Sequence, residues 1–132
     1  MNRYLLSSLL LLFCLTGCMQ NNGHIGDLFG LWNLKEIRQD DNIAHMHNTH
    51  FIAFQSSVVS LRVVDPETFV AREAYGSYKK ERDSIHLHIT DGDTNLYKDF
   101  GFESSDISFG LTLSKKRLEL EREGKQWTFI LH

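Results

Sequence analysis

The stretch Phe29-Gly30-Leu31-Trp32-Asn33-Leu34 decides the fold that we infer for this chain of 132 residues. A glycine stands two residues before a tryptophan, at the head of the first segment that reads as a strand. Glycine lets the backbone approach where a side chain would collide, and an indole is large enough to cover one end of a small core. The stretch therefore predicts the first strand of a sheet that closes on itself.

Seven further short segments follow, and most of them alternate apolar and polar residues. The clearest is 84–90, where His86 and His88 alternate with Ile and Leu. Hairpin-length turns separate most of the segments, which is typical of an antiparallel meander. We expect strands at residues 29–38, 50–55, 58–64, 69–78, 84–90, 107–113, 118–121 and 127–131.

An open sheet of eight strands would leave two edges unpaired, and the last strand here is long and apolar. Pairing the first strand with the last removes both edges. Eight strands enclose an interior that side chains can fill, or that can hold one small ligand. We therefore predict an all-β fold, a small eight-stranded antiparallel up-and-down barrel.

Three places interrupt the regular pattern. Residues 40–49 are rich in Asp, Asn and His and predict a loop. Gly76 stands late in a predicted strand and indicates a bulge or bend. Residues 96–102 predict one irregular or helical turn.

The two tryptophans are expected to close the barrel. Because the first and last strands should be neighbours, we expect Trp32 and Trp127 to pack near one another at the barrel end, beside Gly30. We expect the rest of the interior to include Phe29, Leu34, Phe109, Leu111, Leu118, Leu120 and Phe129.

The start of the chain is a targeting segment. Arg3 precedes an apolar run at 5–15 that is too short for a membrane span, which needs about 20 residues, but suits an export signal. The run ends in Leu15-Thr16-Gly17-Cys18, which resembles the lipobox of bacterial lipoproteins. The alternative is an ordinary secretory signal with a chance cysteine. We predict a removed signal peptide at 1–17, lipidation of Cys18, a flexible tether at 18–27 and one domain at 28–132.

A lipidated Cys18 has consequences for stability and location. Two or more acyl chains, such as palmitate, would hold the protein stably on a membrane. Cys14 is lost with the signal, so the mature protein would have no disulfide. Surface-exported lipoproteins of some Gram-negative bacteria resemble one another in having an acidic cluster directly after this cysteine, and no such cluster follows Cys18. We therefore expect a protein of the Gram-negative cell envelope, anchored in the outer membrane and facing the periplasm. Loss of Arg3 leaves 13 basic and 17 acidic side chains without a basic stripe, which argues against nucleic acid.

Taken together, these features resemble the lipocalin-like lipoproteins of Gram-negative bacteria. The resemblance is carried by the motif ending at Cys18, by Gly30-x-Trp32, by Phe100-Gly101-Phe102, and by the tail from 113–120 into 124–129. It implies a small eight-stranded barrel on a lipid anchor. True lipocalins usually add a helix after the barrel, whereas the last predicted strand here runs almost to His132. We therefore expect no deep ligand cavity.

Histidines form the first candidate site. His45, His47 and His50 fall within six residues and could gather a divalent metal with Asp40 or Asp41. Their spacing matches no zinc motif, and the alternative is a solvated polar loop. We predict no metal and no cofactor.

The pair His86 and His88 shares one face of a strand, as metal-chelating pairs do. The intervening apolar residues claim the interior, so both rings should face solvent. A third ligand brought alongside by strand pairing would change that interpretation.

The predicted strands at 50–55, 58–64 and 69–78 carry apolar residues on both faces. This half of the barrel could have a polar-lined opening for an acidic or mixed ligand, its outer face could be covered by a partner or a second copy, or loops could fold over it. A ligand would enter at the end opposite Trp32. The residues that would line it are Phe54, Leu61, Arg62, Arg72, Glu73 and Tyr75.

The sequence predicts a binding role and no enzymatic activity, because it has no nucleophile elbow, catalytic cysteine or phosphate-binding loop. We expect a lipid-anchored envelope protein that binds a small apolar or amphipathic ligand. The alternative is a filled barrel that docks on another envelope protein. An interior packed by side chains favours the alternative, and a lined pocket of a few hundred cubic ångströms favours ligand binding.

Overall fold

The computed structural model describes residues 27–132, so the predicted signal peptide, Cys18 and nearly all of the predicted tether lie outside the described residues. Over these residues the fold consists of nine strands and one short 3-10 helix, η1, and all strand pairings are antiparallel. The all-β prediction is confirmed, although the number of strands is nine. The elements are β1 (Gly30–Gln39), β2 (Asn42–His45), β3 (His50–Gln55), β4 (Val58–Val64), β5 (Ala71–Lys80), β6 (Ser84–Gly92), η1 (Leu96–Phe100), β7 (Asp106–Ser114), β8 (Arg117–Arg122) and β9 (Lys125–Leu131).

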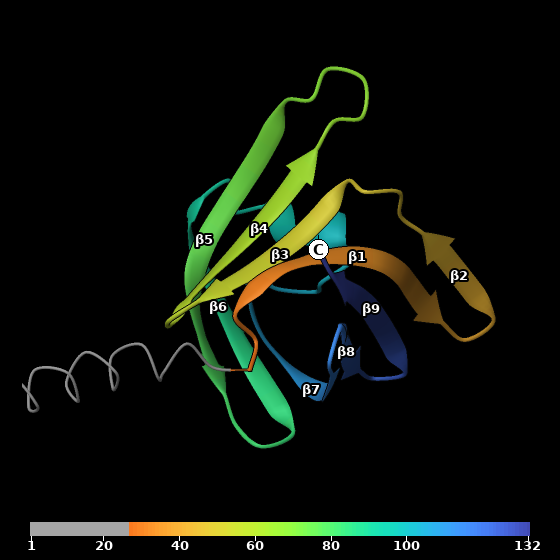
Figure 1. The fold of residues 1–132 in the computed structure, drawn as a ribbon, viewed down its shortest axis with the longest axis vertical. Coiled ribbons are helices and arrows are strands. Elements are labelled where there is room, and N and C mark those ends of the chain that lie inside the picture. Colours follow the sequence, from red (N-terminus) through yellow and green to blue (C-terminus); the bar gives the residue numbers. More distant parts are fainter. Residues whose placement is uncertain (1–26) are drawn as a thin grey trace, which may run out of the picture.

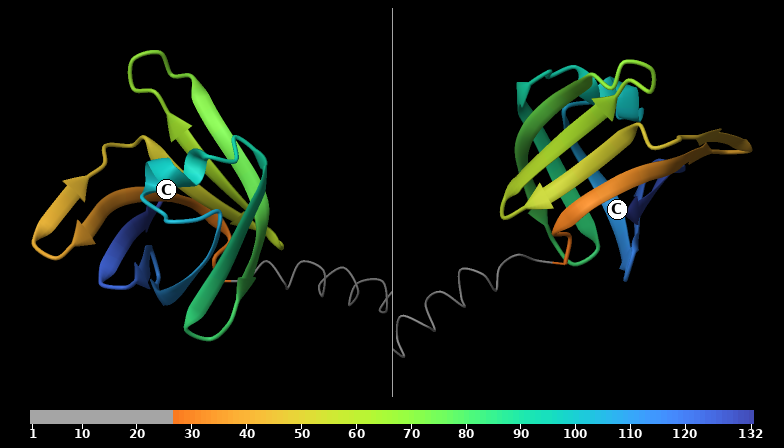
Figure 2. Two further views of the ribbon diagram at one scale, coloured as in Figure 1. Left: turned by 180° about the vertical axis from the view of Figure 1, so that it is seen from behind. Right: turned by 45° about the horizontal axis from the view of Figure 1, so that its top comes forward.

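Eight of the strands form a closed ring, as Figures 1 and 2 show. β1 pairs with β3 on one side and with β9 on the other. Along the rest of the ring each strand pairs with the next one in the chain. The first and last strands of the meander are therefore paired as predicted, which leaves neither of them as a free edge.

The ninth strand, β2, corrects the prediction of a loop at 40–49. β1 continues beyond β3, and its last residues, 36–39, pair with β2 as a hairpin outside the ring. The two-residue turn places Asp40 at φ 54°, a left-handed conformation that aspartate tolerates. All four β2 residues are exposed, so the strand has no buried face. It therefore lacks the alternation by which a strand can be recognised.

The interior of the ring is filled by side chains. Leu34, Phe129 and the other four predicted core residues are buried, whereas Phe29 is 50% exposed, contrary to the prediction. Phe29 precedes β1, and Leu28 takes the interior place at this end. The largest fully buried side chains are Trp32, Trp127, Phe54, Phe100, Phe129, Leu28, Leu34, Ile52, Leu61, Ile85, Leu87 and Leu96.

Two glycines have the structural roles that the sequence suggested. Gly30 has φ 135°, and a Cβ there would lie 2.9 Å from a Leu131 methyl group. Gly76 sits at a register shift between β5 and β6, and a Cβ there would lie 1.9 Å from the carbonyl oxygen of His88. The predicted bulge at Gly76 is confirmed, and the irregular turn predicted at 96–102 is η1.

The two indoles are separated, so the prediction that they pack near one another is wrong. Trp32 lies opposite Leu131, while Trp127 lies opposite Ile37. Neighbouring antiparallel strands run in opposite directions, so a residue near the start of β1 meets the end of β9. Trp32 therefore lies at the end where the chain enters the ring, and Trp127 lies at the end covered by η1.

Within residues 27–132, no helix combines the length and the apolar character required to span a bilayer.

Candidate functional site

An open pocket of about 560 Å³ lies at the η1 end of the ring, opposite Trp32. It is formed where β3 begins, where β4 ends and where the connection 65–70 turns back into β5. Its walls combine apolar and polar side chains, which is typical of small-molecule sites. The lining residues are Thr49, His50, Val63, Val64, Asp65, Pro66, Thr68, Val70 and Arg72.

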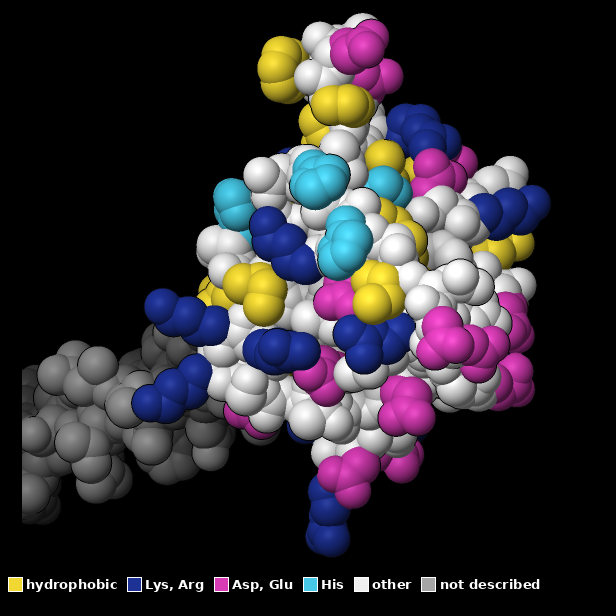
Figure 3. All heavy atoms as spheres, turned by 90° about the vertical axis from the view of Figure 1, so that its right-hand side faces the viewer, with side chains coloured by type: hydrophobic (Ala, Val, Ile, Leu, Met, Phe, Trp, Pro, Cys, Tyr) yellow, Lys and Arg dark blue, Asp and Glu magenta, His cyan; other side chains and the backbone are white. Residues whose placement is uncertain are grey.

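The β4–β5 connection projects beyond the ring (Figure 1, top) and is ordered by Asp65. The Asp65 carboxylate accepts hydrogen bonds from the backbone N–H groups of Glu67 (2.8 Å) and Thr68 (3.2 Å). These bonds lower the pKa of Asp65 and keep it ionised. Figure 3 shows hydrophobic and acidic side chains at the projecting tip, where Phe69 is 78% exposed and has φ 61°.

His50 forms the floor of the pocket. Its ring packs edge-on against Phe100 of η1 at 5.3 Å, and its Nδ1 lies 2.7 Å from the Thr49 hydroxyl. Burial lowers the pKa of His50, and the charge of Arg72 adds to this, while Asp99 opposes both. The imidazole is therefore neutral at pH 7.

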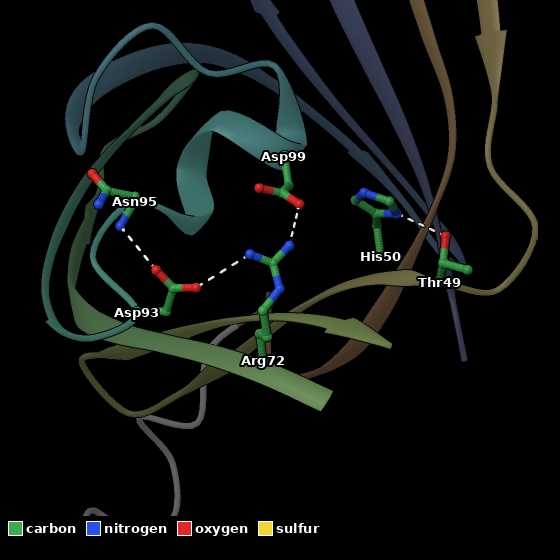
Figure 4. A network of polar contacts seen from close by, with 6 residues as sticks. All are labelled: Thr49, His50, Arg72, Asp93, Asn95 and Asp99. Atoms are coloured by element: carbon green, nitrogen blue, oxygen red, sulfur yellow. Dashed lines mark hydrogen bonds and ion pairs between the residues drawn. The ribbon is translucent and has the colours of Figure 1, made fainter. Parts of the chain in front are cut away.

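Arg72 joins β5 to the segment that covers this end of the ring (Figure 4). Its guanidinium contacts Asp93 at 3.3 Å and also forms an ion pair with Asp99 of η1. Asp93 in turn accepts a hydrogen bond from the backbone N–H of Asn95 at 3.3 Å. One cation and two carboxylates thus stand beside the pocket.

Of the six predicted lining residues, only Arg72 reaches this pocket. Phe54 is buried in the interior and packs on Tyr78 at 4.9 Å, and Leu61 is also buried. Arg62 and Glu73 are cross-strand partners on the outer face of the sheet. There they line a separate groove of about 330 Å³ together with Leu61 and Tyr75.

The groups in the outer groove pair with one another. Arg62 donates a hydrogen bond to Glu73 at 2.8 Å, and the Tyr75 hydroxyl also contacts Glu73. The hydrogen bond from Tyr75, followed by that from Arg62, lowers the pKa of Glu73, while the same contact raises the pKa of Tyr75. Successive residues of a strand point to opposite faces of the sheet, so Arg72 lies in the pocket while its neighbour Glu73 lies in the outer groove.

The metal site considered for His45, His47 and His50 is not assembled. β2 carries His45 on the hairpin outside the ring, while β3 places His50 in the pocket. Across residues 27–132, no group of three or more His, Cys, Asp or Glu side chains is arranged to hold a metal ion.

His86 and His88 face solvent as predicted, with side chains 46% and 52% exposed. Strand pairing does bring a third group alongside them. The Asp106 carboxylate of β7 contacts His86 and lies 3.3 Å from His88, and Ser108 lies 2.5 Å from the other His86 nitrogen. The contact with His86 lowers the pKa of Asp106. These side chains form a hydrogen-bonded network on the surface, and their arrangement does not fit a metal ion.

The sequence-based interpretation missed Asp93 and Asp99, which flank Arg72. A signal was present, since Asp91-Gly92-Asp93 directly follows the predicted strand at 84–90 and precedes the expected turn at 96–102. An arginine near the end of a neighbouring strand can form charge-assisted hydrogen bonds with carboxylates that fold over that end.

Comparison with known proteins agrees with this architecture. The lipocalin-like domain family matches residues 12–130 of the chain. The fold is similar to that of a lipocalin-like protein from Bacteroides uniformis, at 24% identity, covering 81% of this chain and all of that one, with a TM-score of 0.71. An uncharacterized protein from Bacteroides eggerthii is similar at 21% identity, 80% and 99% coverage and a TM-score of 0.68. No protein with a curated description matches. The chain belongs to the lipocalin-like domain family.

Proposed function

We propose that this protein is a lipid-anchored, non-catalytic binding protein of the Gram-negative cell envelope, and that it takes a small amphipathic ligand in the pocket at the η1 end. One observation carries the proposal: the pocket of about 560 Å³ combines valine walls with a polar floor. Its volume lies in the range of about 300–1,000 Å³ that is usual for small-molecule sites. A lipocalin-like fold supports a binding role.

The ligand would sit at the mouth of the ring and not inside it. Trp127 and Phe100 are fully or almost fully buried beneath this end, and they occupy the space that a deep cup would need. The pocket owes its depth to the β4–β5 connection, which stands above the ring (Figure 1).

The pocket contains one contact between a hydroxyl and an imidazole, from Thr49 to His50. The two residues are adjacent in the chain, and the contact fixes the orientation of the His50 ring. We assign it a positioning role, in keeping with a binding protein.

The anchoring part of the proposal is supported by the sequence motif that ends at Cys18. Replacement of Cys18 by Ser removes the thiol that would be acylated. Cells fed an alkyne-tagged palmitate should label the wild-type protein and leave Cys18→Ser unlabelled, with the variant lost from the membrane fraction. Equal labelling of both would overturn this part.

The binding part is tested by native mass spectrometry of the protein isolated from its own envelope. We expect a copurifying small molecule that is lost from Val70→Trp, in which an indole fills the pocket mouth. Val58→Trp is the matched control, because Val58 is similarly exposed on β4 but lies outside the pocket. Retention of the molecule by Val70→Trp would exclude this pocket as its site.

A second function is favoured by the filled interior and by the exposed side chains of Phe69 (78%) and Val70 (64%). Exposed apolar side chains at a loop tip suit docking on another envelope protein. In that case a protein partner would crosslink to the wild type and not to Phe69→Ser, and no small molecule would copurify.

A further inference from the structure

We infer that the pocket selects a ligand whose polar end is a cation, namely a protonated amine on an apolar body. This inference rests on the binding role proposed above and specifies the chemistry of the ligand. The geometry that carries it is the placement of three carboxylates and one guanidinium around a pocket walled by valines.

The charge around the pocket is negative. Arg72 is the one basic side chain in its lining, and both terminal nitrogens of Arg72 contact carboxylates, those of Asp93 and Asp99. Asp65 lines the wall that the β4–β5 connection forms. The lining itself holds one aspartate and one arginine. Together with the two carboxylates that pair with Arg72 from outside the lining, these four side chains carry three negative charges and one positive charge, a net charge of −2.

His50 does not compensate for this charge at neutral pH. Its burial beside Phe100 lowers its pKa, and so the floor of the pocket is uncharged. Asp65 stays ionised because two backbone N–H groups hold its carboxylate.

A carboxylate ligand would meet an arginine that is already paired twice. It would have to displace Asp99 or Asp93, or else approach Arg72 against the repulsion of both. An ammonium group would instead be attracted by the surplus carboxylates, while Val63, Val64 and Val70 contact its apolar chain. Of the two charged classes, the geometry favours the amine.

The test uses the mature lipoprotein in zwitterionic phosphatidylcholine nanodiscs with isotope-labelled valine methyl groups. Octylamine, octanol and octanoate share a chain length and differ in their polar end. Shifts of the Val63, Val64 and Val70 methyl signals report on the pocket itself, and empty nanodiscs correct for partitioning into lipid. We expect octylammonium to bind at least ten-fold more tightly than octanoate, with octanol between them, and 0.5 M NaCl should narrow the difference.

Two variants and one control locate the carboxylates that cause the preference for the amine. The double variant Asp93→Asn/Asp99→Asn frees Arg72 and should reverse the order, so that octanoate binds more tightly than octylamine. Asp40→Asn/Asp41→Asn makes the same change of charge on the β1–β2 turn and should keep the wild-type order. Asp65→Asn is a milder variant on the exposed connection, and it should reduce the preference without reversing it.

The outcomes separate the inference from the proposed function. Tight binding of octanoate, or equal binding of octanol and octylamine, overturns the inference and leaves the pocket as a binding site. Absence of valine methyl shifts with all three probes overturns the proposed function itself. An unchanged order of affinities in a folded Asp93→Asn/Asp99→Asn variant also overturns the inference, because the carboxylates would then not select the ligand.

Discussion

Trp32 and Trp127 close opposite ends of the strand ring, and each donates its indole N–H to a backbone carbonyl. Trp32 reaches Leu28 at 2.9 Å, and Trp127 reaches Phe100 at 2.6 Å. Both rings are at most 2% exposed. Each end is thus closed by a large apolar group whose one polar atom is satisfied by a segment that crosses the ring.

The two ends differ in what surrounds the indole. At the Trp32 end, Phe54 and Tyr78 extend the apolar core. At the Trp127 end, η1 and the β4–β5 connection add charged side chains and an open pocket. A buried indole thus closes the ring at both ends, whereas the pocket that we propose as the binding site is built by segments added at one end.

The largest expected effect tests the similarity of the two ends. Trp32→Ala and Trp127→Ala should each lower the free energy of unfolding by about 3–5 kcal/mol, because each leaves a cavity and an unpaired carbonyl. Urea unfolding measures both values. Phe69→Ala is the control and should change stability by less than about 0.5 kcal/mol. A loss below 1 kcal/mol for either tryptophan would show that its end is not closed as we describe.

The next largest loss of stability is expected at the bulge between β5 and β6, in the side of the ring. Gly76→Ala should cost about 3 kcal/mol, the upper end for overpacking, because the new Cβ meets the His88 carbonyl oxygen at 1.9 Å. Gly110→Ala is matched to it, since its Cβ would meet the nearest atom at an ordinary 3.6 Å. Similar melting temperatures for the two variants would contradict the close approach of β5 and β6 at this bulge.

The ring itself could be predicted from the sequence, because alternation such as that of Ile85, Leu87 and Ile89 depends only on neighbours in the chain. β2 could not, since a fully exposed strand has no apolar face to reveal it. Trp32 and Trp127 are separated because β1 and β9 run in opposite directions, and the prediction took into account only that the two strands are neighbours. For the pocket, the sequence predicted the end of the ring, opposite Trp32, but only one of the lining residues.

The pocket residues show where sequence reasoning stops. Arg72 does line the pocket, whereas Arg62, Glu73 and Tyr75, which the sequence predicts for the same site, lie on the outer face. Strands with apolar residues on both faces do not indicate which face is inside. The partners of Arg72 depend on how η1 folds back over the ring, and such long-range placement leaves no local pattern.

At the pocket end, His50 should make the free energy of unfolding depend on pH. The pKa of folded His50 lies below 6.5, so the unfolded chain takes up a proton first as the pH falls. The stability that this group contributes is present above pH 6.5 and is lost as the pH falls through the window below it. His50→Gln should therefore flatten this part of the pH dependence in urea unfolding between pH 5 and 7.5, with His45→Gln as the exposed control. A slope unchanged in His50→Gln would show that His50 is not desolvated.

The smallest effects compare charged pairs outside and beside the pocket. Arg62–Glu73 on the outer face and Arg72–Asp99 at the pocket end are similarly exposed, at 49% and 30% against 51% and 33%. Double-mutant cycles with Arg→Met and Asp→Asn or Glu→Gln should give coupling energies below about 1 kcal/mol for each pair. Equal, small values would mean that the Arg72 cluster contributes little to holding η1 on the ring, which leaves ligand selection as its use. A coupling several times larger at Arg72–Asp99 would make the cluster a structural clamp, and the charge at the pocket would then be a by-product of closing that end.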